Sequence, residues 1–408
     1  MTTDTNPEKI EELLTRSIDT IYPSKEALKT VLLSGKQLRI YVGIDPTATY
    51  VHLGHSTNYI LLRRLHELGH KIIVLIGDFT AMIGDPTDKT AARSKLTREE
   101  VENNFKTFKK QIGKILNFSS WKNPIEFKFN ADWLAKLSFS DVIELSSHFT
   151  VQQMIERDTF QKRLKDNKPL YVHEFFYPLM QGYDSVALKA DVEIGGTDQT
   201  FNMLAGRTLA RAYQKRDKFV ITTTLLENPV TGEKLMSKSL GTGIGLDENP
   251  QDMYGKVMRL PDEALIQCFI DCTTLPMSEI ESLKTLAAEN PRDLKMRLGR
   301  EIVSMYHSKS AAEKAEANFV STFQKKEIPD DVEEIKMESG EKLVDLLVRA
   351  KVIESKSEFR RLVEQGGVHK LTGTDTNEKG DGQKVEDQFA AAEQGTYKIG
   401  KRRFIKIK

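Results

Sequence analysis

The alternation of apolar and polar residues near the start of the chain predicts a strand, a helix and a second strand. The first strand is the short β-rich run LRIYVGID (38–45). Between 55 and 68 the apolar residues recur at helical spacing, and Gly69 stands where a glycine commonly ends a helix. The run KIIVLIGDF, which starts at Lys71, is apolar like a parallel strand buried on both faces. Together they predict a βαβ unit, and open α/β sheets bind ligands beyond the carboxyl ends of their strands.

Further patterns extend this picture along the chain. Thr97 and Glu100 fit a capping box that opens a helix to about Leu116. Strand and helix signals mix between about 125 and 215, and KFVITTTLL (218–226) is another β-rich run. These patterns favour a mixed α/β fold for the first half of the chain.

The second half changes character twice. A polar, glycine-rich loop, TGEKLMSKSLGTGIGL (231–246), precedes a helical pattern from Asn249 to about Phe323. The charged segment 324–340 has few apolar residues and predicts a linker. After Glu341 short helices are expected, the second of which begins at a capping box, Ser355-Lys-Ser-Glu.

Composition narrows the class of protein. With 408 residues, of which 39% are hydrophobic and 29% charged, the chain can bury a sizeable core, which excludes disorder as its main state. No apolar run approaches the length of a membrane helix, and the polar N-terminus lacks the pattern of a secretory signal. Cys268 and Cys272 cannot form a disulfide framework and favour buried structural thiols. We therefore expect a soluble, cytoplasmic protein of two or three domains.

Bulk charge says little about partners. The 60 Lys and Arg residues balance 59 Asp and Glu residues, which leaves a net charge of +1. A nucleic acid would therefore have to be held by local basic patches.

The first candidate site residues lie in the loop after the first predicted strand, in the segment His52-Leu-Gly54-His55. A helix N-terminus favours phosphate, and Gly54 leaves room for a flat adenine ring. His52 and His55 could donate hydrogen bonds to phosphate oxygens as charge develops on them. Two structural histidines would give the same four letters, and the further ligands of a tetrahedral zinc site are not evident nearby.

A second candidate lies in the glycine-rich loop, at Met236-Ser237-Lys238-Ser239. A lysine between two serines on a mobile loop suits a phosphate that is gripped in a transition state and then released. A solvated turn is the alternative for this element alone.

Together and in this order, the two elements resemble the two signatures of class I aminoacyl-tRNA synthetases. Four further segments narrow the resemblance to tyrosyl-tRNA synthetases of the bacterial type, over nearly the whole chain: YVGIDPTA (41–48), IGDPTDK (83–89), YPLMQGYD (177–184) and IGGTDQ (194–199).

Two departures from the family pattern stand out. Leu235 occupies the place of the first signature lysine, with Lys234 one position earlier, while the second lysine, Lys238, is present. Whether Lys234 takes over the missing role is open. In the tail, a long polar stretch follows EQGGVHK, without the usual asparagine-glycine turn.

The resemblance implies an α/β fold, with a Rossmann-like parallel-sheet catalytic domain, a helical domain and a small α+β S-four-like RNA-binding domain. The implied boundaries are a catalytic domain at 1–240 with an inserted segment at about 117–190, a helical anticodon-side domain at 241–325, a linker at 326–340 and the RNA-binding domain at 341–408.

The resemblance also implies a two-step reaction. The tyrosine carboxylate attacks the α-phosphate of ATP, which releases pyrophosphate, and the ribose of the terminal tRNA adenosine then takes the tyrosyl group. Catalysis would rest on positioning and electrostatic stabilisation. Mg²⁺ would arrive with ATP and not in an all-protein cage, and no prosthetic group is implied.

Site roles follow residue by residue from the matching motifs. The implied catalytic residues are His52, His55, Lys238, Thr47, Lys89 and Arg93. The implied ATP-binding residues are Gly43, Asp45, His52, Gly54, His55, Gly196, Asp198, Met236, Ser237, Lys238 and Ser239. Tyr41 and Asp184 would bind the phenol hydroxyl, and phenylalanine would leave both of them unpaired. The remaining tyrosine-binding residues are Asp85, Tyr177 and Gln181 for the ammonium group and Gln199 near the carboxylate.

The implied partners are tyrosine, ATP, tRNA(Tyr) and a second copy of the chain, held through the catalytic domain. The spacing of four basic residues in the tail fits RNA phosphate contact better than a merely solvated face: Lys356, Arg360, Arg361 and Lys370.

Three rival functions remain. Tyr41, Asp184 and the tail argue against a tryptophanyl-tRNA synthetase. The presence of His52, His55 and Lys238 argues against a non-catalytic RNA-binding paralogue. Leu235, in the place of the first signature lysine, keeps this alternative open. Another nucleotidyltransferase would need neither the tail nor the segment 177–184.

Overall fold

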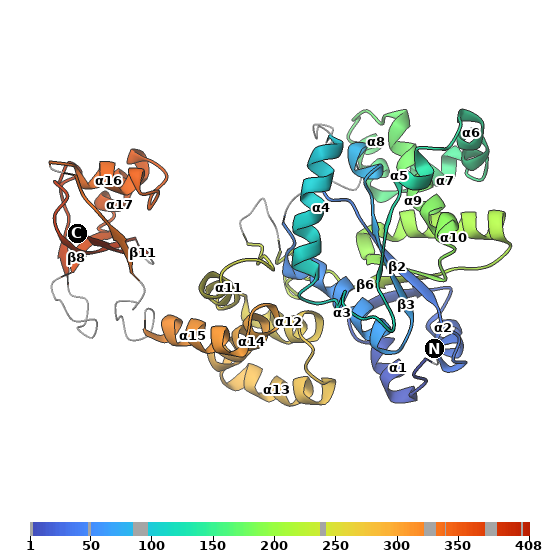
Figure 1. Ribbon diagram of the computed structural model, residues 1–408, viewed down its shortest axis with the longest axis horizontal. Helices are drawn as coiled ribbons and strands as arrows, with labels where there is room; N and C mark the ends of the chain where they lie inside the picture. Colours follow the sequence, from blue (N-terminus) through green and yellow to red (C-terminus); the bar gives the residue numbers. More distant parts are fainter. Residues whose placement is uncertain are drawn as a thin grey trace. The chain divides into compact units, whose positions relative to one another are not determined.

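The protein is described by a computed structural model. The described residues are 3–47, 50–84, 97–236, 242–321, 332–338, 340–371, 382–400 and 403–408. The chain divides into two compact units, Met1–Ser308 and Lys309–Lys408, shown in Figure 1. Among the described residues, no helix has both the length and the apolar character to cross a membrane.

A six-stranded sheet forms the centre of the first unit (Figure 1). Its order is β1-β6-β5-β2-β3-β4, with β1 antiparallel to β6 and all other neighbours parallel. The chain runs outward from β2 to β4 and then returns to β5 on the other side of β2. This reversal makes the carboxyl ends of β2 and β5 the switch point where such sheets bind ligands. The strands are β1 Ile18–Tyr22, β2 Arg39–Ile44, β3 Lys71–Ile76, β4 Glu126–Phe129, β5 Val192–Gly196 and β6 Phe219–Thr223.

The predicted βαβ unit is confirmed as β2, α3 (Leu53–Glu67) and β3. Gly69 follows α3 with a positive φ of 92°, a conformation that a glycine adopts without strain. Positions 72 to 76 of β3 are buried, as an apolar run covered on both faces should be. The capping box at Thr97 is also confirmed, because Thr97 and Glu100 bond to each other's backbone nitrogens.

Helices surround the sheet, and two of them, α9 (Val172–Ala187) and α10 (Thr200–Gln214), lie in close contact. α9 and α10 pack so closely that a Cβ on Gly182 would lie 3.1 Å from the backbone of Ala205 and of Gly206. The helix opened by Thr97 ends at Ile112, before the predicted Leu116, because Gly113 follows it. The helices of this part are α1 Pro7–Leu13, α2 Lys25–Leu33, α4 Arg98–Ile112, α5 Ala131–Leu134, α6 Phe139–Ser147, α7 Val151–Ile155, α8 Asp158–Lys165, α9 Val172–Ala187 and α10 Thr200–Gln214.

The predicted helical pattern after the glycine-rich loop is confirmed. α12 buries the free thiols of Cys268 and Cys272 on its inner face. The helices that follow the loop in the first unit are α11 Pro250–Val257, α12 Leu265–Cys272, α13 Met277–Glu289 and α14 Pro291–Tyr306.

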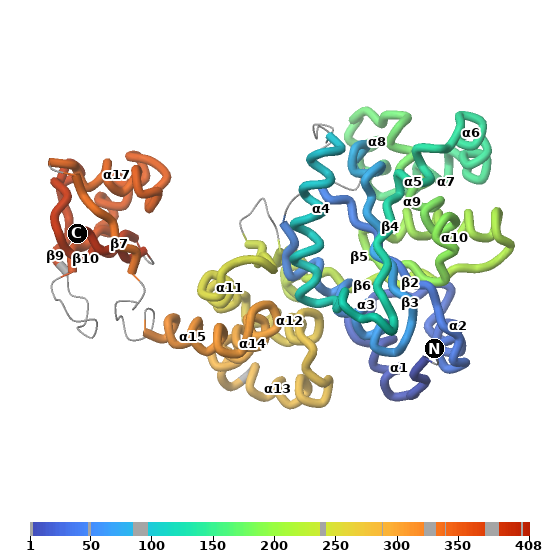
Figure 2. Tube along the Cα trace, viewed as in Figure 1, coloured from blue at the N-terminus to red at the C-terminus, as the bar shows by residue number. Residues whose placement is uncertain are grey.

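The second unit holds a five-stranded sheet of order β7-β11-β10-β8-β9 and two helices that pack on a shared core (Figure 2). Leu346, Leu347 and Phe359 from the helices meet Ile399 and Ile405 from the sheet in this core. Its elements are β7 Glu333–Ile335, α16 Leu343–Arg349, α17 Lys356–Glu364, β8 Val368–Leu371, β9 Gly382–Lys384, β10 Gly395–Ile399 and β11 Arg403–Ile407, preceded by α15 Lys309–Phe319.

Two details of the second unit differ from expectation. β7 lies in the segment predicted to be a linker, where a single buried residue, Ile335, follows two exposed glutamates. The capping box at Ser355 is half formed. The Ser355 hydroxyl accepts from the Glu358 nitrogen at 3.2 Å, but the Glu358 carboxylate bonds to the nitrogen of Glu354.

Candidate active site

The carboxyl ends of β2 and β5 form an open edge where a ligand can approach the backbone. A Cβ on Gly43 would meet no atom within 4 Å, so the space beside the end of β2 is empty of protein. Beyond β5, a Cβ on Gly196 would lie 2.7 Å from a carboxylate oxygen of Asp198. The switch point of the sheet therefore holds four of the predicted site residues: Gly43, Gly196, Asp198 and Gln199.

Asp45 connects three elements at this edge. Its Oδ1 accepts a hydrogen bond from the Thr80 hydroxyl at 2.7 Å, and its Oδ2 accepts one from the Tyr177 hydroxyl at 2.8 Å. Gly77 makes room for the carboxylate, since a Cβ there would lie 1.9 Å from Oδ1. Asp45, predicted to contact ATP, thus holds Tyr177 of α9 in place.

Asp184 is a buried acceptor in the interior of the same region. Its Oδ1 accepts from the indole nitrogen of Trp133 at 2.7 Å and its Oδ2 from the side-chain amide of Asn130 at 3.2 Å. Burial raises the pKa of Asp184 well above its usual range, and the two hydrogen bonds oppose that rise. The phenol-binding carboxyl expected from the sequence is therefore enclosed and oriented by two donors.

Tyr41, the other predicted phenol contact, is fully buried on β2. Its hydroxyl and the Ser185 hydroxyl are hydrogen-bonded at 2.8 Å. Burial raises the pKa of Tyr41, and the charges of Glu193 and Asp184 raise it further. Tyr41 and Asp184 thus share one interior, and Tyr41 is tied to the residue that follows Asp184 in the chain.

The two signature histidines stack on each other at the N-terminus of α3. Their ring centroids lie 3.8 Å apart at an interplanar angle of 18°. The His52 backbone nitrogen donates to His55 Nδ1 at 3.3 Å, so the neutral His55 ring carries its proton on Nε2. This bond caps the helix and leaves the Nε2–H of His55 as the donor of that ring. The structural and the chemical interpretation of this motif are therefore compatible.

Both ends of the glycine-rich loop lie against the His52–His55 turn. A Cβ on Gly54 would lie 3.4 Å from the Cβ of Met236, on the near side of the loop. On the far side, the Leu53 nitrogen donates to the Ile244 carbonyl at 3.0 Å, and the Tyr50 hydroxyl donates to the Gly243 carbonyl at 2.8 Å. The described residues on both sides of 237–241 thus lie against the first signature element.

The first half of the loop is a short hairpin in which Lys234 is exposed and Leu235 half-buried. The Leu235 nitrogen donates to the carbonyl of Leu226 at 3.0 Å. Thr47 is half-buried, and its nitrogen bonds to the Asp45 carbonyl. Six predicted site residues lie outside the described residues: Asp85, Lys89, Arg93, Ser237, Lys238 and Ser239.

Several residues of this region escaped the sequence analysis. Glu193 and Lys218 form a buried ion pair, Ser185 bonds to Tyr41, and Asn130 and Trp133 hold Asp184. A usable signal existed for Glu193, because a charged residue between Val192 and Ile194 of a buried parallel strand needs a partner.

Named relatives resemble this chain over nearly its whole length. Residues 33–324 match the family described as tRNA synthetases class I (W and Y). Tyrosine–tRNA ligases of Carboxydothermus hydrogenoformans and Haemophilus ducreyi are both 45% identical to this chain and cover 97% of it, with 97% and 96% of their own lengths aligned.

This chain belongs to the bacterial-type tyrosyl-tRNA synthetases. Solved structures agree on the fold. A truncated mitochondrial tyrosyl-tRNA synthetase of Aspergillus nidulans is 24% identical, has a TM-score of 0.66 and covers 77% of this chain and 94% of its own. A tyrosyl-tRNA synthetase of Archaeoglobus fulgidus, solved with L-tyrosine, is 21% identical, with a TM-score of 0.59, over 76% of this chain and 100% of its own.

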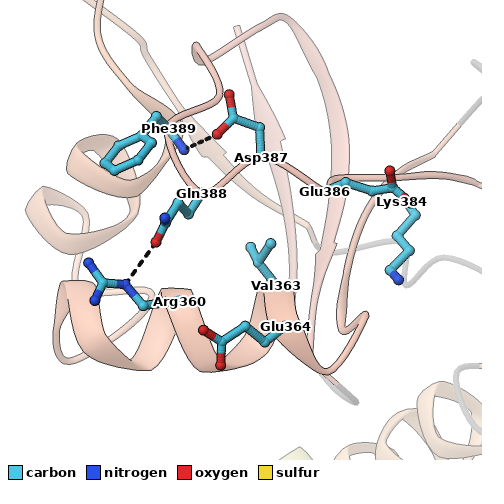
Figure 3. Close-up of a pocket in the computed structure, with 8 residues that line it drawn as sticks. All are labelled: Arg360, Val363, Glu364, Lys384, Glu386, Asp387, Gln388 and Phe389. Carbon is cyan, nitrogen blue, oxygen red and sulfur yellow. Dashed lines mark hydrogen bonds between the residues drawn. The ribbon is translucent and has the colours of Figure 1, made fainter.

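In the second unit of this synthetase, the predicted RNA-binding cations are only partly grouped. Lys356 pairs with Asp345 at 2.7 Å and Lys370 with Glu393, while Arg361 is exposed. Arg360 donates to Gln388 at 2.8 Å beside a hollow of about 450 Å³ (Figure 3). Three carboxylates share that hollow, which makes it a poor phosphate site: Glu364, Glu386 and Asp387. Within the described residues, no three His, Cys, Asp or Glu side chains are grouped to hold a metal ion.

The lowered pKa of His52 predicts how the free energy of unfolding depends on pH. Burial lowers the pKa of His52 from 6.5 to about 4, and burial together with the charge of His52 lowers the pKa of His55 to about 3. The unfolded chain therefore takes up protons first as the pH falls, so the free energy of unfolding should decrease from about pH 6.5 toward pH 4.

We expect His52→Asn, which places a favourable N-cap residue before α3, to lose less stability between pH 7 and pH 5 than the parent protein. Urea unfolding at the two pH values measures this difference. An equal or larger loss in the variant would show that His52 is not a source of the dependence.

Proposed function

We propose that this synthetase is a tyrosine–tRNA ligase that makes tyrosyl-adenylate from L-tyrosine and ATP and transfers the tyrosyl group to the 3′ end of tRNA(Tyr). The observation that carries the proposal is that the described residues on both sides of 237–241 lie against the His52–His55 turn. A buried pair of phenol-binding candidates, Tyr41 and Asp184, supports it. The tyrosine–tRNA ligases that align over nearly the full chain support it.

In the activation step, an oxygen of the tyrosine carboxylate attacks the α-phosphorus, and the bond from that phosphorus to pyrophosphate breaks. No covalent enzyme intermediate is needed, so the protein would act by positioning and by stabilising charge on the phosphate. The Nε2–H of His55 and the ammonium of Lys238 are the donors we assign to this charge. ATP would bring Mg²⁺ with it, held by phosphate oxygens.

Recognition of tyrosine would use the enclosed polar groups. We assign the phenol hydroxyl to Asp184 and Tyr41, and the ammonium group to Tyr177, Gln181 and Asp85. Gln199 would lie near the carboxylate. The bond from Tyr177 to Asp45 supports this assignment, because the hydroxyl proton of Tyr177 goes to Asp45 and its oxygen can act toward a cationic donor only as an acceptor.

ATP–pyrophosphate exchange with tyrosine, tryptophan and phenylalanine, followed by charging of tRNA(Tyr), tests this function. We expect exchange with tyrosine alone, followed by charging of tRNA(Tyr). We place this activity in the cytoplasm, where tRNA is used. Exchange with tryptophan, or none at all, would contradict the proposal.

For the tail, Arg361→Glu should raise the KM for tRNA and leave exchange unchanged, since a phosphate-contacting cation acts only on RNA binding.

A second copy of the chain is the partner we propose for an exposed apolar surface on the inserted segment. Figure 1 shows α6, α7 and α9 gathered at one end of the first unit. Four apolar side chains there are largely exposed, which is typical of an interaction surface: Phe139 (81%), Ile143 (56%), Val151 (69%) and Val172 (74%).

We expect the native protein to have twice the chain mass of 46.3 kDa in solution. Val172→Asp should shift it toward the single-chain mass, because a buried unpaired carboxylate is costly. Trp121→Asp is the control, since Trp121 is even more exposed than Val172 but lies outside these helices. Light scattering at micromolar concentration distinguishes the two states. A single-chain mass for the parent protein would refute this surface as a dimer contact.

A further inference from the structure

A polar cluster lies where the segment after the glycine-rich loop meets the turn before α3. It joins the Tyr50 hydroxyl, the Glu248 carboxylate, the Lys256 ammonium and the Gly243 carbonyl. The Tyr50 oxygen lies 2.8 Å from the Gly243 carbonyl oxygen and 3.1 Å from Glu248 Oε1. Lys256 on α11 donates to the same two acceptors, at 3.1 Å to the Gly243 carbonyl. Whichever acceptor takes the single phenol proton, the hydroxyl is bound within this cluster.

The fold leaves space for the Tyr50 ring against this segment. A Cβ on Gly245 would lie 2.4 Å from the Tyr50 ring, and a Cβ on Gly243 would lie 3.1 Å from the Tyr50 hydroxyl oxygen. Any larger side chain at Gly245 would displace the ring. Burial and the charge of Glu248 raise the pKa of Tyr50, so its hydroxyl keeps its proton at neutral pH. Tyr50 is therefore a permanent hydrogen-bond donor to this segment.

The backbone pairing beside the cluster is short. Two backbone hydrogen bonds, of 3.0 and 2.8 Å, join residues 51–53 to residues 244–246. They flank an isolated antiparallel bridge between His52 and Gly245, and Glu248 Oε1 accepts from the Gly245 nitrogen at 3.0 Å. A two-stranded pairing of this length is marginal by itself. The side chains that cross it therefore decide how firmly the two segments are held together.

The cluster reaches the signature histidines through ring contacts. The Tyr50 and His52 ring centroids lie 6.1 Å apart at an interplanar angle of 60°, an edge-to-face arrangement, and His52 stacks on His55. His55 carries the Nε2–H donor that we assign to the phosphate. A displacement of about 1 Å can cost a reaction roughly a hundredfold in rate. A contact that fixes this turn can therefore act on the rate of activation.

We propose that Tyr50, Glu248 and Lys256 are positioning residues for tyrosine activation, which fix the His52–His55 turn by binding it to the segment after the glycine-rich loop. None of the three is assigned to tyrosine or ATP. The cluster is largely enclosed, with 18% of the Glu248 side chain and 30% of the Lys256 side chain exposed, so its bonds are stronger than those of a surface ion pair. This inference rests on the proposed role of His55 in activation.

Tyr50→Phe tests the proposal, because it removes one oxygen atom and keeps the ring. In single-turnover formation of tyrosyl-adenylate by the full-length protein, we expect the rate constant to fall by roughly tenfold. The KM for tyrosine should stay within about twofold of the parent value, since no tyrosine contact is removed. Lys256→Met, which removes the other side-chain donor to Gly243, should give the same pattern. A parent-like rate constant in both variants would refute the proposal.

Tyr254→Phe and Lys295→Met are the matched controls. Tyr254 lies on the same helix as Lys256, and its hydroxyl donates to the carbonyl of Met296 at 3.4 Å. Lys295 pairs with Asp262 at 2.5 Å, and 17% of its side chain is exposed. Both variants should keep the parent rate constant even if they lower thermal stability. An equal loss of rate in these controls would show that any disturbance of the helices after the loop slows activation, which contradicts a role specific to the cluster.

A double variant decides whether Tyr50 acts through the histidines. If it does, Tyr50→Phe should cost less than about twofold in a His55→Asn background, where the assigned donor is already lost. A loss as large as in the parent protein would show that Tyr50 acts elsewhere and would overturn the proposal.

His55→Asn alone separates the inference from the assignment on which it rests. If this variant keeps the parent rate constant, the assignment of His55 is wrong and the inference falls with it. If it loses rate while Tyr50→Phe and Lys256→Met do not, the role of His55 stands and the role of the cluster is refuted.

Discussion

Asp184→Asn is expected to lower kcat/KM for tyrosine in the exchange assay by roughly a hundredfold. The carboxylate accepts from Trp133 and Asn130 with separate oxygens, and an amide offers only one oxygen. One of the two donors, or the substrate phenol, would then face an NH₂ group. A buried polar group left unpaired costs about 1–3 kcal/mol, which corresponds to this loss.

Asp271→Asn is the control for a general effect of removing a buried carboxylate. Asp271 on α12 accepts from Gln267 and from Thr224, the residue after β6, and burial raises its pKa as it does for Asp184. This variant should lose stability in urea and keep the parent KM for tyrosine. A similar loss of activity in both variants would show that folding, and not recognition, is being measured.

Lys238→Ala is expected to lower the rate constant of activation by roughly a hundredfold or more, with little change in the KM for tyrosine. Such a pattern belongs to a donor that acts on charge in the transition state. Lys234→Ala should change the rate by less than about threefold. Lys234 is exposed on the hairpin at the start of the loop, and Leu235, not Lys234, lies in the position of the first signature lysine.

Single-turnover formation of tyrosyl-adenylate measures both variants without interference from product release. If Lys234→Ala costs as much as Lys238→Ala, then Lys234 has taken over the missing role. Leu235→Lys extends the test, because it restores the family pattern on the same hairpin. It should raise the rate only if the loop lacks a cation that the reaction uses.

Local patterns in the sequence were enough for the elements that build the site. β2, α3, Gly69 and β3 follow from apolar periodicity and a terminal glycine, which depend on neighbours in the chain. β7 escaped because one buried isoleucine among glutamates does not make a pattern. Its strand character comes from pairing with β11, far along the chain.

The site shows the same division between local and long-range information. The family motifs pointed to Tyr41, Asp45, Tyr177 and Asp184. In the structure Tyr177 donates to Asp45 at the end of β2, while Tyr41 and Asp184 are buried in the interior. Motifs do not show, however, which other side chains of the protein these residues contact. That Tyr41 bonds to Ser185, or that Asp45 holds Tyr177, depends on how α9 packs against the sheet, and this is fixed only by the tertiary fold.

The order of strands in the sheet has a consequence for synthesis on the ribosome. β1 is the first strand of the chain to emerge, yet its partner is β6, the last of the six, with Ile21 opposite Ile221. β2 can pair with β3 early, but its other neighbour, β5, is made later. A nascent chain that holds only β1 to β4 therefore exposes unpaired strand edges, a state prone to aggregation, and β1 stays unpaired for about half of translation. We expect this synthetase to depend on chaperones while it is being made, because its first strand gains its partner only after residue 219.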